Sequence, residues 1–307
     1  MGRYIARRAL LTIPVLLGAS FLIFAMVYAL PGDPIRALGG DRPLSPAVVA
    51  ELRDRFNLND PFLVQYAKWL GGALTGDLGT DFRMRPVLDT ILLRLPVTAR
   101  LALVALVFET VLGILAGVLA GIRRNSWYDN VMLITTTLII SIPILVLGFL
   151  AQYVFGLQLG LFPISGIDRG WFSFLLPGFV LGAGSLAYIA RLTRTSLIEN
   201  LNADFVRTAR AKGLRPRIVV TRHTLRNSLI PVVTYIGADI GALMGGAIVT
   251  ESVFNIPGIG QAVFRSIQSQ EGAVVVGIVT LMVFFYIFFN LVVDILYAVL
   301  DPRIRYE

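Results

Sequence analysis

The sequence predicts an all-α integral membrane protein with six transmembrane helices, on the evidence of its composition and of six long apolar stretches. Of the 307 residues, 56% are hydrophobic and only 15% are charged, and the mean hydropathy is +0.76. In a soluble domain about a quarter of the residues are charged. This chain therefore has too few charges to cover a water-facing surface.

Each apolar stretch has about the 20 residues that cross a bilayer as a helix. The six predicted spans are Ala9–Leu30, Leu101–Ile122, Val131–Phe155, Phe172–Ala190, Leu229–Val249 and Ala273–Leu300. Basic residues precede the first span, as in a secretory signal. However, its uncharged run exceeds the ~7–15 residues of a signal's apolar region, and Pro31 lies where a cleavage site would follow. We expect a helix that is retained.

Sixteen of the 27 Lys and Arg fall on one side of the predicted membrane, and nine of them lie in the loop 191–228. Positive charge in short loops marks the cytoplasmic side. We therefore expect a cytoplasmic tail and first helix over 1–30, an extracytoplasmic segment over 31–96, a five-helix core over 97–300 and a cytoplasmic tail over 301–307.

The predicted outer segment has local helix signals. Ser45-Pro46 and Asp60-Pro61 each combine an N-cap residue with a proline suited to the first turn. Apolar residues then recur every four positions, which predicts one packed helix face. They are Phe62, Tyr66, Leu70 and Leu74. The segment is interpreted either as a brace for the bundle or as part of a docking surface or substrate entrance.

Three acids, Glu109, Asp239 and Asp294, lie within the predicted spans. Charges inside a membrane rarely face lipid. Structural pairing and contact with a water-filled pathway both remain open for Asp239, while Asp294 lies near a span end, where an arginine can pair with it. In a different class of protein, an ion-coupled secondary transporter, Glu109 and Asp239 would carry the coupling ion.

Glycines recur every four residues on two spans, at 113, 117 and 121 and at 237, 241 and 245. Small residues at this spacing let membrane helices approach closely. Either packing within the chain or a subunit interface would use them.

Several chemistries are excluded by absent residues. The chain has no cysteine and one histidine, so Cys-ligated metals and clusters of histidines are ruled out, and His223 lies among basic residues where we do not expect a Ser-His-Asp triad. It has no phosphate-binding loop of the G-x-x-x-x-G-K-[ST] type. We expect neither a cofactor nor catalysis by this chain.

The loop 191–228 predicts a helical hairpin. Asn202 or Asp204 suits the N-cap of a first helix, Gly213 suits its left-handed C-terminus, and Pro216 suits the first turn of a second helix. Phe205 and Ala209 are expected on one face of the first helix. The basic residues fit topology or anionic lipid better than nucleic acid, which we do not expect as a partner, and the small residues fit a docking surface.

In and around this loop the sequence resembles that of a known protein family. FVRTARAKGL (Phe205–Leu214) and RHTLRNSLIPVVT (Arg222–Thr234) are similar to the cytoplasmic coupling loop of bacterial ABC-importer permeases, above all the B-type permease subunits of dipeptide and oligopeptide importers. Other matching pieces follow in the family's order. They are LPGDP (Leu30–Pro34), GDLG (Gly76–Gly79), FPISG (Phe162–Gly166), TESVFNIPGIG (Thr250–Gly260) and NLVVDILYAVLDPRIR (Asn290–Arg305).

The resemblance implies a type I importer permease in the bacterial inner membrane, which forms half of the pathway with a second homologous permease. Two ATP-binding subunits and an extracytoplasmic binding protein would complete the importer. The general coupling motif begins Glu-Ala-Ala, whereas this chain has Arg207, Thr208 and Ala209, followed by Gly213. The residues that would couple to the ATPase are Arg207, Thr208, Ala209, Arg210, Ala211, Lys212, Gly213 and Leu214.

Candidate pathway residues are Asp239, Phe254, Pro257 and Gly258. Asp239 lies near the middle of its span, and the other three lie in the loop that we expect at the outer mouth. The family implies peptides as substrates, but its relatives also carry haem, nickel complexes or glutathione, and the sequence does not choose among them. A membrane anchor without transport is the third interpretation, which the acids within the spans disfavour.

Overall fold

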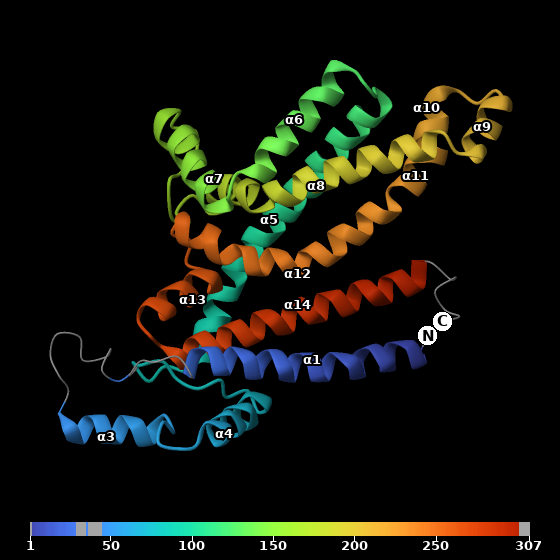
Figure 1. The fold of residues 1–307 in the computed structure, drawn as a ribbon. Helices are drawn as coiled ribbons and strands as arrows, with labels where there is room; N and C mark the ends of the chain where they lie inside the picture. Colours follow the sequence, from blue (N-terminus) through green and yellow to red (C-terminus); the bar gives the residue numbers. More distant parts are fainter. Residues whose placement is uncertain (1, 29–34, 36–44, 301–307) are drawn as a thin grey trace. The chain divides into compact units, whose positions relative to one another are not determined.

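The structure is a computed structural model that describes residues 2–28, 35 and 45–300, and it is helical without a named β-strand in these ranges (Figure 1). The predicted motif at Leu30–Pro34 and the predicted tail 301–307 lie outside the described residues, as does the side chain of Asp294.

Most of the helices are α-helical, and three short segments have other helical geometries. The α-helices are α1 (Gly2–Tyr28), α3 (Pro46–Arg55), α4 (Phe62–Leu74), α5 (Val87–Ile122), α6 (Trp127–Ser141), α7 (Ile144–Ala151), α8 (Leu175–Leu201), α9 (Asp204–Ala211), α10 (Pro216–Ile218), α11 (Leu225–Ser228), α12 (Ile230–Val253), α13 (Ile259–Gln268) and α14 (Gly272–Leu300). The other segments are π-helical at Gln152–Gln158 and Val219–Thr224 and 3₁₀-helical at Gly170–Phe174.

In the described part of the chain, four helical stretches are long and apolar enough to cross a membrane. They are Leu10–Tyr28, Val87–Ile122, Gly170–Leu201 and Gly272–Val293. Two bent pairs, Trp127–Ser141 with Ile144–Gln158 and Pro216–Ser228 with Ile230–Gly245, bring the number to six if each pair is one span. The predicted all-α membrane fold is thus confirmed.

The third predicted span is not the straight helix that its apolar run indicates. The chain bends by 108° between α6 and α7. Ile142 is extended, with φ −95° and ψ 122°, and Pro143 caps α7. A proline disfavours the helical conformation of the residue before it and has no N–H to continue the helix. Apolar length alone therefore missed this break.

The helix that contains the second predicted span begins before that span. Helix α5 has 36 residues and passes through Pro96 without ending. The expected boundary between the outer segment and the core, at residues 96–97, therefore falls inside a helix. A proline within a membrane helix is tolerated where the surroundings satisfy the carbonyl that it leaves without a donor.

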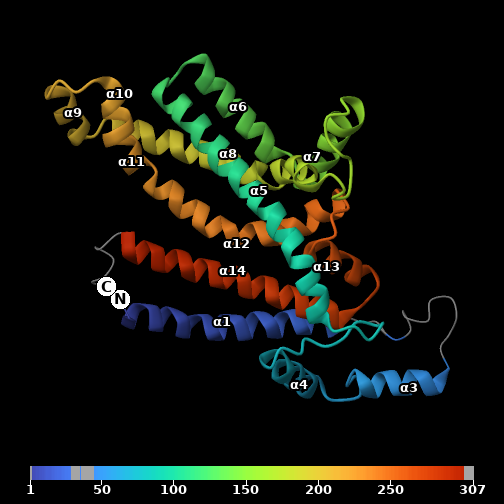
Figure 2. The ribbon, with the colours of Figure 1, turned by 180° about the vertical axis from the view of Figure 1, so that it is seen from behind.

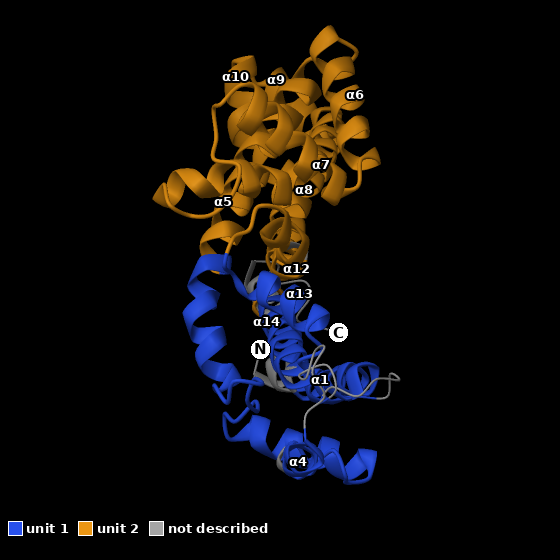
Figure 3. Ribbon diagram, turned by 90° about the vertical axis from the view of Figure 1, so that its left-hand side faces the viewer, with its two compact units in different colours: residues 1–98, 257–291 blue, residues 99–256, 292–307 orange. Residues whose placement is uncertain are grey.

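The chain forms two compact units (Figure 3). Unit 1 comprises Met1–Thr98 and Pro257–Leu291, and unit 2 comprises Ala99–Ile256 and Val292–Glu307. Each unit thus joins segments that are far apart in the sequence.

In unit 1, α4 packs on α1 through aromatic side chains. The ring of Phe21 lies 5.9 Å from Phe62 and 5.1 Å from Tyr66, and the Tyr66 hydroxyl lies 2.9 Å from Ser20 Oγ. Two members of the predicted apolar face thus pack as expected, whereas Leu74 is 81% exposed. The face turns away from α1 at its C-terminal end.

Of the N-cap residues predicted for α3 and α4, one caps its helix and the other does not. Ser45 caps α3 as predicted, because its Oγ accepts a hydrogen bond from Val48 N at 3.5 Å. Asp60 does not cap α4, whose N-cap is Pro61. Its carboxylate instead pairs with Lys68 Nζ at 2.6 Å.

Helix α14 lies alongside α1 in unit 1 (Figures 1 and 2). At Gly272 a Cβ would lie 3.0 Å from a methyl group of Val27, so a small residue fits the approach of the two helices. Helix α13 is joined to α5 by a hydrogen bond from Ile259 N to Thr98 Oγ1 at 2.9 Å.

In unit 2, α8 is the central helix and contacts α6, α7 and α12. Most residues of its first half are buried. The glycines of α5 pack against α8, because a Cβ at Gly113 or Gly121 would lie 2.8 Å from Ile189 or 2.9 Å from Leu197. This glycine stripe therefore serves packing within the chain.

Candidate functional site

The predicted docking hairpin is formed by α9 to α11 in unit 2 (Figure 2). Helix α9 begins at Asp204, and its N-cap is Ala203, which has no side-chain capping bond. Neither predicted cap is used. Asn202 Nδ2 donates back to Ile198 O at 3.1 Å, and the Asp204 carboxylate faces Arg207 at 3.4 Å from within the first turn.

The buried face of α9 is one residue away from the predicted face. Val206 is fully buried and Ala209 is 5% exposed, and both pack with Val219 and Leu214. Phe205, expected on the packed face, is 40% exposed. Helical spacing alone does not decide which of two neighbouring apolar residues turns inward.

The opposite face of the hairpin is exposed and basic. Six of the eight predicted coupling residues are exposed, Leu214 is half-buried and Ala209 is buried. The exposed six are Arg207, Thr208, Arg210, Ala211, Lys212 and Gly213. This surface presents positive charge and small side chains, while Ala209 packs on the inner side of the helix.

The end of α9 has the predicted geometry. Gly213 has φ +75°, and its N–H donates to Arg210 O at 2.9 Å. A residue with a Cβ rarely adopts this left-handed conformation, so glycine is favoured there. Pro216 is the first residue of α10, as the sequence predicts.

The hairpin is anchored to the unit by buried hydroxyl groups. Ser228 Oγ donates to Thr224 O at 2.9 Å within the hairpin and lies 3.3 Å from Ser196 O on α8. A buried hydrogen bond thus joins the hairpin to α8.

Two arginines that the sequence indicates only as topology signals join α8 to α6. Arg194 forms a two-pronged ion pair with Asp129, whose carboxylate is almost fully buried, and one of the two bonds is 2.7 Å long. Arg191 donates to Thr136 Oγ1 at 2.9 Å and to Leu133 O at 3.1 Å. Arg191 and Arg194 are three residues apart and so lie on one face of a helix, and this spacing was the sequence signal that could have indicated their shared contact with α6.

Two acids from different helices meet within unit 2. Glu109 of α5 is fully buried, and its carboxyl group faces that of Asp239 of α12. The hydroxyl groups of Ser185 and Tyr235 adjoin Asp239 and lie 3.4 Å from each other. Periodicity within one helix could not have predicted this pairing.

A pocket of about 340 Å³ lies beside these groups. Its walls come from α6, α7, α8 and α12, and most of them are apolar. Its polar lining consists of Ser185, Tyr188 and Tyr235, and the two tyrosine rings lie 4.3 Å apart. The hydroxyl groups that adjoin Asp239 therefore also border the pocket.

Of the other predicted pathway residues, Phe254 lies in unit 2 with Asp239 but far from it along the chain axis of α12. Phe254 is 1% exposed, and fifteen residues of helix place it about 22 Å along the axis from Asp239. Its carbonyl accepts from Gly166 N at 3.0 Å. Pro257 and Gly258 belong to unit 1, where Gly258 is the buried N-cap of α13.

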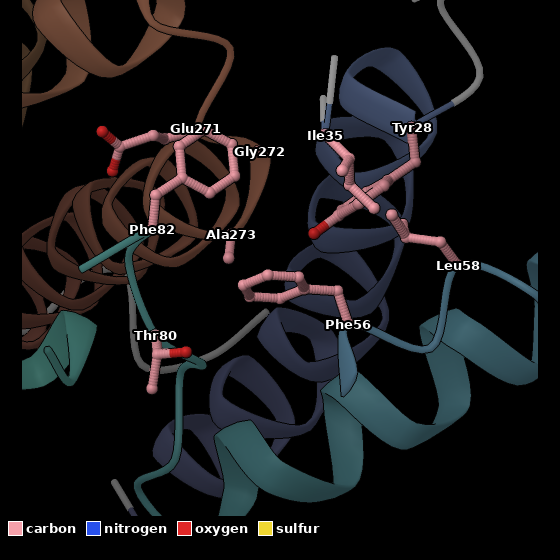
Figure 4. Close-up of a pocket in the computed structure, with 9 residues that line it drawn as sticks. All are labelled: Tyr28, Ile35, Phe56, Leu58, Thr80, Phe82, Glu271, Gly272 and Ala273. Atoms are coloured by element: carbon pink, nitrogen blue, oxygen red, sulfur yellow. The ribbon is translucent and has the colours of Figure 1, made fainter. Parts of the chain in front are cut away.

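A second pocket, in unit 1, is too small for an organic ligand. Its volume is about 20 Å³, which is room for roughly one water molecule. Figure 4 shows the side chains of Tyr28, Phe56 and Phe82 around it. Among the residues that the structure describes, no cluster of His, Asp and Glu could hold a metal ion.

The long apolar helices and the exposed basic hairpin define a polytopic helical membrane protein. The family model "Binding-protein-dependent transport system inner membrane component" matches residues 113–306, and "Binding-prot-dependent transport system membrane comp, N-term" matches residues 1–102. The chain belongs to this family of transport permeases, and the resemblance noted in its sequence is confirmed.

Relatives match over the full length. The chain is 36% identical over 334 aligned residues to the dipeptide transport system permease protein DppB of Alkalihalophilus pseudofirmus. It is 40% identical over 309 residues to the glutathione transport system permease protein GsiC of Escherichia coli strain K12. Both alignments cover 100% of each chain.

A solved structure confirms the fold. The chain is similar to a chain of the MetNI methionine ABC transporter in an inward-facing conformation, with a TM-score of 0.57 and 19% identity. The match covers 69% of this chain and 96% of that chain.

Proposed function

We propose that this protein is a permease subunit of an ATP-driven importer of di- or oligopeptides. The observation that carries the proposal is the full-length match to permeases named for a dipeptide and for glutathione, which is itself a tripeptide. This chain has no phosphate-binding loop. Nucleotide hydrolysis is therefore assigned to other subunits.

The proposed assembly pairs this chain with a second, homologous permease. Two ATP-binding subunits dock beneath the pair, and a binding protein delivers substrate from outside the cytoplasmic membrane. Both termini and the hairpin face the cytoplasm in this arrangement, which the excess of basic residues on that side supports.

Helix α9 is proposed as the element that the ATP-binding subunit moves. Its exposed face is basic and small, and its buried face is fixed to the rest of the hairpin through Val206 and Ala209. The bond between Ser228 and Ser196 carries a displacement to α8, the central helix of unit 2. Movement between two packed arrangements of helices then exposes the pathway alternately to each side.

The test is reconstitution of the permease with its partner permease, ATP-binding subunits and binding protein in liposomes. We expect uptake of labelled di- and tripeptides with ATP, and none with a non-hydrolysable ATP analogue, because hydrolysis resets the cycle. Uptake by this permease without ATP-binding subunits, driven by an ion gradient, would instead favour the ion-coupled transporter and contradict the proposal.

A further inference from the structure

We propose that Glu109 and Asp239 form a binding site for the ammonium group of the transported substrate, which enters from the pocket beside Ser185 and Tyr235. The inference rests on the proposed function, because every unblocked peptide carries an ammonium group at its N-terminus.

The first argument is the state of Glu109. Its side chain is 0% exposed, and apart from the facing carboxyl group of Asp239 its carboxyl oxygens have no hydrogen-bond partner among the described residues. The neighbouring residue on α8 is Gly182, where a Cβ would lie 3.3 Å from Glu109 Oε2. A side chain at position 182 would therefore crowd the Glu109 carboxyl group, whereas glycine leaves room for it.

The second argument is that two acids face each other without a cation. Among the described residues, no ion pair joins Glu109 or Asp239 to a lysine or arginine. Asp239 Oδ2 is also buried without a partner. Acids within a membrane span cost free energy unless a positive charge or a proton compensates them. The pair therefore needs a proton or a cationic group to compensate it.

The third argument is the chemistry of the adjoining pocket. Tyr188 and Tyr235 offer ring faces, to which an ammonium group is attracted, and Ser185 offers a hydroxyl acceptor. The remaining walls are aliphatic, including Ile139, Ile142 and Leu147. An organic ammonium ion with an apolar body matches both parts of the pocket.

A bare divalent metal ion matches this environment less well. Ca²⁺ takes 6–8 oxygen ligands, whereas the described groups next to the acids are two hydroxyls and aromatic rings. An anion would meet two carboxyl groups, and no basic side chain is among the described residues that line the pocket. The observations thus favour an ammonium group.

The binding test uses the assembled permease and ATPase complex in nanodiscs, without the binding protein. The probes are n-butylammonium and n-butanol, which differ in charge but share the same apolar body, and saturation-transfer NMR measures their binding. We expect butylammonium to bind at least about tenfold more tightly than butanol, since a buried charge pair is worth more than 1.4 kcal/mol. Glu109→Gln and Asp239→Asn should each abolish that difference.

The control is Asp168→Asn, which removes an exposed acid from a loop of the same unit and should leave the preference unchanged. If Glu109→Gln does not assemble, Tyr188→Leu removes an aromatic wall and should still weaken butylammonium binding several-fold. Equal binding of both probes to the wild-type complex, or an unchanged preference in the Glu109 and Asp239 variants, would show a structural acid pair and overturn the inference.

A transport measurement separates this inference from the proposed function. A complex that prefers butylammonium through the two acids but imports no peptide would retain the ammonium site and refute the peptide importer. A complex that imports peptides, with no preference between the probes, would retain the importer and refute the site.

Discussion

Single residues of α5 set how closely it approaches α8. At Gly117 an added Cβ would overlap the carbonyl of Ala190 and lie 2.6 Å from Thr193 Cβ. Real Cβ atoms do not approach so closely, and the nearest obstacle is backbone, which cannot rotate away. Glycine at this position is therefore required by packing. By contrast, nothing lies within 4 Å of a Cβ at Gly245 of α12, although the sequence places both glycines in similar stripes.

We therefore predict that Gly117→Ala lowers the free energy of unfolding of the purified permease by about 1–3 kcal/mol, the usual cost of overpacking. The matched control, Gly245→Ala, adds the same methyl group to open space and should cause no loss. Thermal or denaturant unfolding in detergent measures both. Equal stability of the two variants would show that α5 can shift to accommodate the methyl group.

At the scale of elements, α9 is a short helix whose two ends are defined differently. Its N-terminus lacks a capping side chain, whereas its C-terminus is fixed by the left-handed Gly213 and by the turn into Pro216. The packed side of the helix holds only Val206 and Ala209. An element with so small a core depends on its C-terminal turn to keep its orientation.

We predict that Gly213→Val uncouples ATP hydrolysis from transport in the assembled importer. A β-branched residue at φ +75° is strained, and the left-handed conformation costs roughly 1–2 kcal/mol. Gly213→Asn is the conformational control, because asparagine tolerates this region of φ and ψ. The measurement is peptide-dependent ATPase activity, together with a test of assembly by size-exclusion chromatography.

The asparagine variant should keep most of the coupling that the valine variant loses. If the valine variant assembles and couples ATP hydrolysis to transport normally, the left-handed conformation at Gly213 is not needed to transmit movement from the ATP-binding subunits.

At the scale of the whole molecule, the distribution of basic residues predicts the side of the membrane on which each loop lies. The loop 191–228 carries nine basic residues, whereas the loop that holds Ser165 carries only Arg169. Translocation of short basic loops is disfavoured. These two loops are therefore expected on opposite sides.

Cysteine labelling can test this topology without a background, since the chain has no native cysteine. We predict that Ser165→Cys reacts with a membrane-impermeant maleimide in spheroplasts. Glu199→Cys, which is also exposed, should react only after permeabilisation. Tyr306→Cys should behave like Glu199→Cys if the C-terminus is cytoplasmic. The reverse pattern would invert the proposed orientation, and the hairpin would not meet ATP-binding subunits.

Features governed by local chemistry were predictable from the sequence. Apolar length identified the helices that can span a membrane, and the residues around Gly213 and Pro216 set the turn of the hairpin, because both depend on neighbours in the chain. The bend at Pro143 is also local, and the apolar run concealed it.

Only the tertiary structure decided which side chains meet across helices. The rotation of α9 turned Val206 inward in place of Phe205, the packing of α8 on α6 joined Arg194 to Asp129, and the packing within unit 2 brought Glu109 to Asp239. Helical periodicity defines a face to within one or two residues, whereas a contact between helices depends on their mutual rotation and close approach. That information is distributed over every packed residue, including the glycines of α5, and no single motif contains it.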